Sequence, residues 1–408
     1  MVKSTCTAAA LTGMTDAAPA QILEPSPAQR EVLRDVQERD IRFGSFVLKP
    51  SITAGSRFDS NVYNRSSPRR SDVSVEIRPR VALETDLGRH SAQIVADATI
   101  ERFATLTTEN TEQFAVRGDT RLDFADQFTA RTSIGYARRV EARGTFGDDL
   151  LTSEPVAYNE LAASASASKK FNRLAATVGG SVVRGRYLDA VINGVRVDQS
   201  YRDFKKLSLQ ARADIALSAR SALFVRGTYG DLSYRYRTST SRDSNSYSVI
   251  AGASFWATEL FELEAALGYI RQDFDNPALK DFSGLDYYVK GSWYPRRRIA
   301  FTASASRSID RSPLPDTSSV LHSEIRVTGS YAATSKLLVG GEVAYIDNDY
   351  AGIDRNEHRI SIAASARYLL TDRLSAFASA GYRHQTFSGS FGRKYEGASA
   401  LIGLRLAL

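Results

Sequence analysis

The feature that most constrains the fold is a two-residue alternation of apolar and polar side chains, which recurs from Gly44 to Leu408. Successive side chains of a β-strand point to opposite faces, so each alternating segment predicts a strand with one apolar and one polar face. These segments run about 10–14 residues, whereas strands of globular proteins usually have about 5–6. A tilted strand needs roughly 9–11 residues to cross a bilayer. In Asp72–Thr85, for example, the apolar series is Val73, Val75, Ile77, Pro79, Val81 and Leu83.

The connections between these segments alternate between tight turns and longer polar loops. Tight turns are predicted at Asp86–His90, Ala125–Gln127, Phe171–Arg173, Ser218–Ser221, Thr258–Leu260, Pro295–Arg298, Thr334–Lys336 and Thr371–Arg373. The longer loops include Asp59–Ser71, Ala142–Ala157, Leu188–Asp203, Arg237–Ser244, Phe274–Ser283 and Asp310–Ser319. Outer-membrane barrels place short turns on the periplasmic side and long loops outside the cell.

These turns give a strand count. Eight tight turns imply sixteen strands, and the first and last strands bring the total to about eighteen, an even number as bacterial single-chain barrels require. The strand at Leu174–Tyr187 alternates least clearly, so the expected range is 16–18. The predicted fold is all-β: a closed antiparallel transmembrane β-barrel with short periplasmic turns, longer extracellular loops and both termini in the periplasm.

Aromatic residues cluster at both ends of the predicted strands, where amphipathic rings favour the membrane–water boundary. The rings beside the tight turns are Phe124, Phe128, Phe255, Phe261, Trp293 and Phe301. Those near the opposite strand ends are Tyr136, Tyr229, Tyr269, Tyr287, Tyr345 and Tyr382. We therefore expect two aromatic girdles.

The composition excludes several classes of protein and site. No window approaches the roughly 20 consecutive apolar residues of a membrane helix. Cys6 is the only cysteine, and the four histidines lie far apart, so neither a disulfide framework, a metal site nor a cofactor site is expected. The net charge of +7 is spread evenly along the chain, which argues against a nucleic-acid-binding face.

The N-terminal segment, residues 1–43, is expected to lie outside the barrel of residues 44–408. Lys3 and the alanines near Ala17–Ala20 resemble an export signal only weakly, and a start codon upstream is the favoured explanation. Ser26–Ile41 has the spacing of a capped, highly charged helix, which predicts a short periplasmic helix.

The polar face predicts a wet interior, because a barrel of 16–18 strands is wider than its side chains can fill. This face also carries Glu101, Asp214, Glu324 and Arg405 besides the candidates below, so its acids and bases are nearly balanced and strong charge selectivity is not predicted. Inward aromatic residues are few: Phe224, Tyr288, Phe377 and Tyr294. The pore-lining candidates are Glu76, Arg78, Arg80, Asp97, Arg117, Asp119, Arg121, Asp123, Arg131, Arg212, Glu264, Lys290, Arg326, Arg367 and Arg383.

Two other classes of protein fit less well. A soluble β-propeller would pack four short strands into each repeat and carry Trp-Asp or Gly-His signatures, which are absent here. An outer-membrane hydrolase would need catalytic groups gathered at one rim, and the sequence shows no such constellation. No enzymatic activity is expected.

The first predicted strand carries a family resemblance. Phe46, Leu48, Pro50 and Ile52 form a Phe-x-Leu-x-Pro-x-Ile opening, and Asp59, Asn61, Val62 and Tyr63 follow as Asp-x-Asn-Val-Tyr. With Ser71-Asp72 and Arg78-Pro79, this stretch resembles a family of alphaproteobacterial β-barrel porins, the BBP2-type barrels. The likeness is sharp over Phe43–Phe124 and compositional through Leu408. It implies an outer-membrane barrel without an assigned substrate, with exopolysaccharide export as a rival role.

The leading hypothesis is a passive channel for small hydrophilic solutes in the bacterial outer membrane. The alternatives are an export or accessory pore for an extracellular polysaccharide and a non-conducting structural barrel. The expected partners are outer-membrane lipid, the solute or polysaccharide, and the barrel-insertion machinery, which reads the C-terminal strand. That strand ends in Leu408 rather than in the aromatic residue common in barrels. No nucleic-acid partner is expected, and the sequence leaves the oligomeric state open.

Overall fold

The computed structural model describes residues 41–85, 87–125, 127–150, 152–235, 242–258, 260–312, 314, 317–389 and 392–408. The predicted export signal and nearly all of the predicted helix at Ser26–Ile41 lie outside these residues. Ile41, the last residue of that predicted helix, belongs to a short strand, β1 (Ile41–Phe43), which forms a hairpin on the first strand of the barrel.

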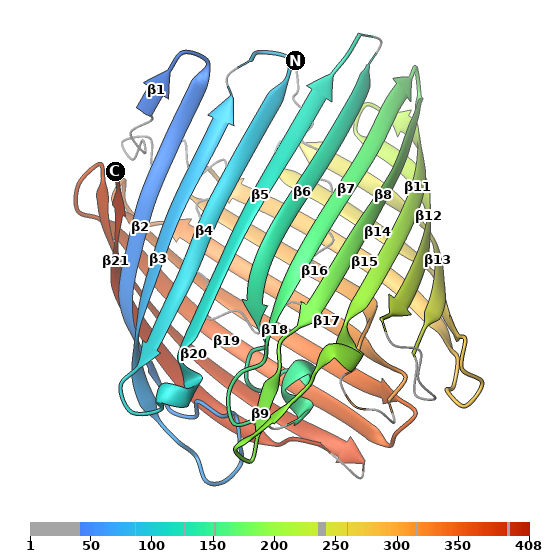
Figure 1. Cartoon of the computed structure of the whole chain (residues 1–408). Helices are drawn as coiled ribbons and strands as arrows, with labels where there is room; N and C mark the ends of the chain where they lie inside the picture. The colour runs from blue at the N-terminus through green and yellow to red at the C-terminus, as the bar shows by residue number, and fades with distance from the viewer. Residues whose placement is uncertain are drawn as a thin grey trace.

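Eighteen of the strands in the described residues form one closed antiparallel wall (Figure 1). The first and last strands of the wall pair in register, from Ser51 opposite Ala407 to Asp59 opposite Ser399, and this pairing closes the barrel. Both the closed antiparallel fold and the predicted count of eighteen are confirmed, and the weakly alternating segment is β8 with the predicted bounds. The wall strands are β2 (Phe46–Asp59), β3 (Asp72–Thr85), β4 (Ser91–Phe103), β5 (Thr111–Asp123), β6 (Phe128–Val140), β7 (Ala157–Phe171), β8 (Leu174–Tyr187), β11 (Phe204–Ser218), β12 (Ser221–Tyr234), β13 (Ser244–Thr258), β14 (Phe261–Phe274), β15 (Phe282–Arg296), β16 (Ile299–Asp310), β17 (Ser319–Ala332), β18 (Leu337–Ala351), β19 (Arg355–Leu369), β20 (Leu374–Gly389) and β21 (Tyr395–Ala407).

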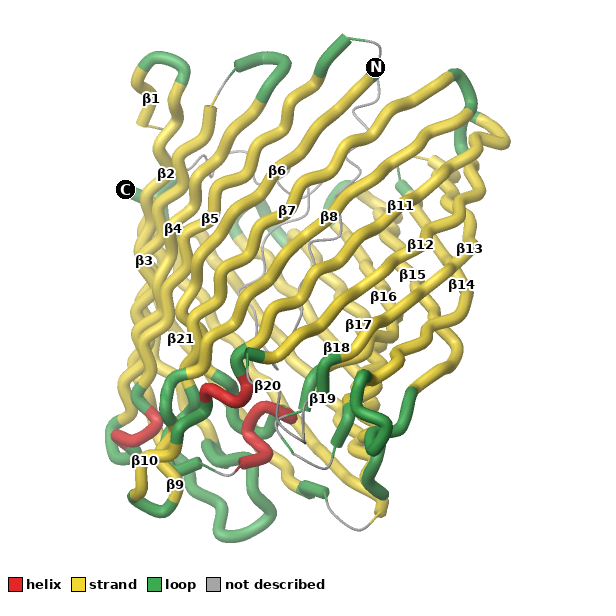
Figure 2. Tube along the Cα trace, turned by 45° about the vertical axis from the view of Figure 1, so that its right-hand side comes forward, coloured by secondary structure: helices red, strands yellow, loops and turns green. Residues whose placement is uncertain are grey.

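The two rims of the barrel differ. One rim carries the tight turns and the described ends of the chain (Figure 1). The other carries the longer loops with all the remaining small elements (Figure 2). These elements are η1 (Thr107–Glu109), η2 (Phe146–Leu150), η3 (Ser200–Arg202), β9 (Ala190–Ile192) and β10 (Val195–Val197). The β18–β19 connection, residues 352–354, is an exception, because it is short although it lies at the loop rim. Following the usual polarity of such barrels, the turns are periplasmic and the loops extracellular.

The outer surface of the wall is apolar. Large hydrophobic side chains that would be buried in a soluble protein are exposed here, among them Ile134 at 61%, Leu267 at 62% and Ile402 at 64%. Each lies between two inward-facing residues of its strand; Ile134, for example, lies between Ser133 and Gly135. No helix in the described part of the chain is long and apolar enough to cross a membrane.

Aromatic rings pair at both edges of this apolar surface. Beside the periplasmic turns, the ring centroids of Phe124 and Phe128 lie 5.5 Å apart, as do those of Trp293 and Phe301. Near the extracellular ends, Tyr229 lies 5.3 Å from Tyr247. These are cross-strand pairs, which stabilise a sheet by packing ring against ring.

Candidate functional site

The interior face of the wall holds all the predicted pore-lining residues. Each of the fifteen lies on a wall strand at a position that alternates with outward apolar residues, so its side chain faces the barrel interior. They come from β3, β4, β5, β6, β11, β14, β15, β17, β19 and β20. The wall brings most of them together in short cross-strand clusters.

The first cluster spans β2 to β4. The Arg57 guanidinium lies 2.8 Å from a carboxylate oxygen of Glu76 and 3.6 Å from one of Glu101. Arg78 also contacts Glu76, and the Ser74 hydroxyl donates to Glu101 at 2.7 Å. Arg57 was missing from the predicted set. The alternation in the sequence could have placed Arg57 on the inner face, because Arg57 stands next to Phe58, which faces outward in the first strand.

A second cluster spans β11 to β15. Arg212 donates to both oxygens of Glu264 at 3.0 Å and to Asp214 at 2.7 Å. Its guanidinium also lies 3.8 Å from the centroid of the Phe224 ring, and the guanidinium of Arg226 lies 5.3 Å from that of Tyr288. The two rings pack with Ile250 and Ala266 as a small apolar cluster inside the wall. Phe224, predicted to point inward, is therefore buried beneath Arg212, and Tyr288, also predicted to point inward, is partly buried beside Arg226.

The remaining predicted residues form smaller groups. Arg326 is bonded to Glu324 at 2.5 Å and contacts Glu342. On β5, Arg117 pairs with Asp119 and Arg121 with Asp123, each at 2.8 Å. Near the loop end of β20, Arg383 pairs with Asp59 at 2.8 Å. Near the turn end of β19, the Nε of Arg367 donates to the Ser375 hydroxyl at 3.3 Å. The register sets Arg80 opposite Asp97, Lys290 opposite Glu264 and Arg131 opposite Arg121.

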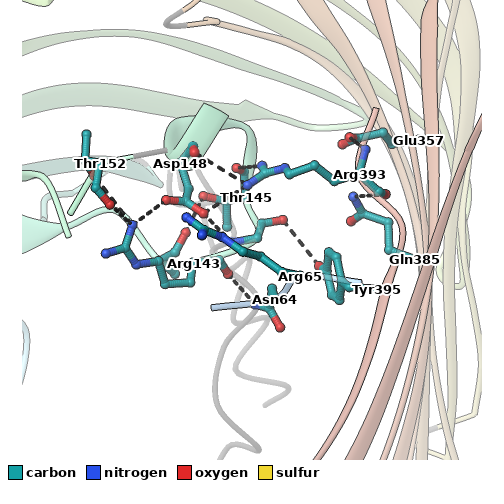
Figure 3. Close-up of polar contacts among 12 residues, drawn as sticks. Asn64, Arg65, Arg143, Thr145, Asp148, Thr152, Glu357, Gln385, Arg393 and Tyr395 are labelled. Carbon is teal, nitrogen blue, oxygen red and sulfur yellow. Dashed lines mark hydrogen bonds and ion pairs between the residues drawn. The ribbon is translucent and has the colours of Figure 1, made fainter. Parts of the chain in front are cut away.

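Apart from the clusters on the wall, the extracellular rim holds a group of charged and polar side chains from several loops, which we call the loop network (Figure 3). Arg143, in the loop between β6 and β7, donates to Glu109 at 2.6 Å and to Asp148 at 2.8 Å. It also donates to the carbonyl oxygen of Thr152 at 2.8 Å. Arg393, in the loop before β21, reaches the same Asp148 at 2.9 Å. One carboxylate thus joins loops that are separated by several strands of the wall.

Further bonds attach this loop to the opposite strands. The Asn64 amide donates to the carbonyl oxygen of Arg143 at 2.6 Å, and Asn64 in turn accepts from Arg383 at 2.7 Å. The Tyr395 hydroxyl donates to the carbonyl oxygen of Gly144 at 3.3 Å, and the backbone N–H of Arg393 donates to Glu357 at 3.0 Å. The loop between β6 and β7 is therefore held against the loops and strand ends of β2, β20 and β21.

The charges of the loop network are shielded from water. The side chain of Arg143 is only 8% exposed, and those of Glu109 and Asp148 are buried as well. Burial alone would lower the pKa of the Arg143 guanidinium, but its bonds to Glu109 and Asp148 raise that pKa above its ordinary value. Arg143 is therefore charged at every pH the cell surface meets. A second buried pair, Arg202 and Glu141 at 2.5 Å, anchors the neighbouring loop before β11.

The sequence did not predict the loop network. Its bonds join residues 34 positions apart, as in Glu109–Arg143, or 245 apart, as in Asp148–Arg393. No periodicity marks such pairs. Among the described residues, no group of three or more His, Cys, Asp or Glu side chains is placed to hold a metal ion.

A closed wall with an apolar outer band, an ionic inner face and one rim of long loops defines an outer-membrane β-barrel. The family described as "Putative beta-barrel porin 2" matches residues 37–408, and the chain belongs to this family. The protein is therefore a porin-type barrel of the bacterial outer membrane. Comparison with curated proteins finds no match.

Several solved outer-membrane barrels are similar in structure at low sequence identity. OpdK from Pseudomonas aeruginosa is 10% identical with a TM-score of 0.43, and the match covers 88% of this chain and 99% of that one. OpdO from the same organism is 13% identical with a TM-score of 0.44, covering 88% and 97%. The ferric enterobactin receptor PfeA of Pseudomonas aeruginosa is 7% identical with a TM-score of 0.46, covering 88% and 80%.

Proposed function

We propose that this barrel is a channel for passive diffusion of small hydrophilic solutes. One observation carries the proposal: inward side chains far apart around the wall remain exposed. Arg80 on β3, Asp97 on β4, Ser164 on β7 and Lys290 on β15 are all exposed although they face the interior. A packed interior would bury them. Barrels of this strand number leave space that side chains do not fill, and charged walls keep that space wet.

The ionic clusters suit a channel of low selectivity. Inward cations such as Arg117, Arg121 and Arg212 have carboxylate partners on the same or a nearby strand. Neighbouring opposite charges cancel at distances beyond the Debye length, about 8 Å at physiological ionic strength. We infer that the wall hydrates solutes without strongly preferring either sign of charge.

The loop network sets the upper size limit in this proposal. The loop between β6 and β7 is tied to β2 and to the β20–β21 side of the wall rather than standing away from the barrel (Figure 3). A loop fixed across a mouth narrows the entrance. We therefore expect small solutes to pass more readily than oligosaccharides.

Planar-bilayer recording of the refolded protein tests the proposal. We expect stable stepwise conductance, similar permeability to small cations and anions, and no block by added oligosaccharide. The absence of conductance in protein shown to be folded would contradict the channel and favour a structural barrel. Concentration-dependent block by oligosaccharide would instead favour polysaccharide export. The covered positions of Phe224 and Tyr288 argue against export, because sugar rings stack on open aromatic faces.

A further inference from the structure

The outer surface of the barrel carries a cluster of basic side chains at the extracellular ends of β6, β8 and β11. The strand register places them in two adjacent rows. In one row, Arg138 on β6 and Arg186 on β8 flank Asn159 on β7. In the next row, Arg184 on β8 lies directly opposite Lys205 on β11. Neighbouring strands are about 4.8 Å apart, so the four residues occupy one compact patch. We call it the outer basic cluster.

The outer basic cluster points away from the barrel interior. Arg138 has the same facing as Tyr136 and Ile134, which are exposed on the lipid side of β6. Arg184 stands opposite Leu161, another exposed apolar residue of that surface. β6, β7, β8 and β11 run side by side in the wall (Figure 1). The bounds of β6, β8 and β11 place the basic residues towards their loop ends. The patch therefore borders the extracellular edge of the apolar band, at the level of the outer-leaflet headgroups.

The charge of the outer basic cluster is not balanced by the protein. Within the described residues, none of the four side chains has a carboxylate within ion-pair distance. Two outward acids on adjacent strands do not pair with the cluster: Glu112 on β5 is bonded to Arg102, and Asp231 on β12 stands opposite Leu207, diagonal to Lys205. Two other outward arginines near the same rim have acidic partners on the protein: Arg102 pairs with Glu112, and Arg271 with Asp273.

Arg184 and Lys205 are two cations that lie directly opposite each other, and this arrangement points to a bound anion. Like charges directly opposite each other on neighbouring strands are destabilising, and no described carboxylate lies within ion-pair distance of either side chain. A bound anion would turn the repulsion into attraction. Arginine is suited to that role because its planar guanidinium donates two parallel hydrogen bonds to a phosphate. The exposed Leu161 and Tyr136, which lie beside Arg184 in the same register row, would meet the acyl chains of the same molecule.

We propose that the outer basic cluster binds the phosphate groups of an anionic glycolipid of the outer leaflet. The cations hold the headgroup while the apolar surface below them contacts the hydrocarbon. The proposal rests on the position of the barrel in the outer membrane and is independent of whether the barrel conducts a solute.

Native mass spectrometry of the folded, detergent-solubilised protein with bisphosphorylated lipid A tests the proposal. The double variant Arg184→Gln/Lys205→Gln removes the opposed pair, and we expect its affinity to fall about 25-fold, from roughly fivefold for each cation lost near a charged lipid surface. The matched control is Arg102→Gln/Arg271→Gln, which removes two outward arginines that already have carboxylate partners. We expect that control to bind like the wild type. Dephosphorylated lipid A should bind weakly to all three proteins.

Two results would overturn the proposal. One is equal retention of bisphosphorylated lipid A by the wild type and the double variant. The other is displacement of the lipid by millimolar inorganic phosphate alone, which would mean that the cluster recognises a free anion. Binding is scored only on protein with the heat-modifiable gel mobility of a folded barrel. If Arg184→Gln/Lys205→Gln does not fold, Arg138→Gln/Arg186→Gln tests the other row in the same assay.

Discussion

The loop network and the inner face of the wall use the same charged residue types in different settings. On β5, Arg117 pairs with an acid two residues away, and its side chain is 57% exposed. At the rim, Arg143 meets acids from two loops, and its side chain is only 8% exposed. Ion pairs in water contribute about 0–1 kcal/mol, because screening and side-chain entropy offset the attraction. A buried charge that loses its partner is far more costly.

This difference separates two tasks within one barrel. Exposed wall charges such as Arg117 keep a surface wet, and their exact partners matter little, whereas the Arg57–Glu76 pair of the same wall is buried. The network charges fix the path of a loop, so each partner is needed. The same contrast explains why exposed wall pairs such as Arg117–Asp119 can line the interior without contributing much to stability, while a few buried residues at the rim hold a loop in place.

Replacing Arg143 should have the largest effect. Arg143→Met leaves Glu109 buried without its cation and Asp148 with Arg393 alone, which should cost about 3–5 kcal/mol. We expect the loss to appear as opening of the loop, seen as faster hydrogen exchange of backbone amides in residues 141–156 and as larger single-channel conductance. The global unfolding midpoint should change less, because the loop is one local unit of the fold.

Arg139→Met is the matched control for this prediction. Arg139 lies at the same rim, faces the interior and has an ion pair with Glu160 at 3.2 Å, but its side chain is half exposed. Its loss should leave loop exchange and conductance nearly unchanged. Equal effects of the two substitutions would remove the distinction between the network and the wall.

The sequence predicted the wall well because every step of that prediction is local. Alternation within a strand fixes the facing of residues such as Glu76 and Arg121, and strands that follow one another in the chain pair side by side through alternating short turns and longer loops. Arg57 could have been found by the same rule. The loop network could not, because Asp148 and Arg393 are brought together only after the barrel has closed. The outer basic cluster could be predicted only in part. Alternation shows which way each of its residues faces, but their position side by side depends on the register of four strands.

An arginine placed on the lipid face tests whether the charged face of the wall is the wet one. Ile134 lies at the middle of β6 and is highly exposed, so Ile134→Arg should destabilise the barrel by about 2–4 kcal/mol in urea titrations of protein refolded into vesicles. Ser164 lies on the neighbouring β7, opposite Ser133, and is exposed towards the interior. Ser164→Arg should therefore change stability by less than about 1 kcal/mol. If Ser164→Arg destabilised the barrel more than Ile134→Arg, the polar side of these strands would face the lipid and the apolar side the interior.

The smallest effect is expected from a wall charge with a single exposed partner. Arg117→Gln removes the pair with Asp119, and because both groups meet water the free energy of unfolding should change by about 0–1 kcal/mol in the same titrations. Conductance should be retained, with at most a small shift towards cations because one positive charge is lost from the interior. A loss of stability as large as that from Arg143→Met would mean that the wall is as dry as the network, and water could not then fill the barrel beside β5.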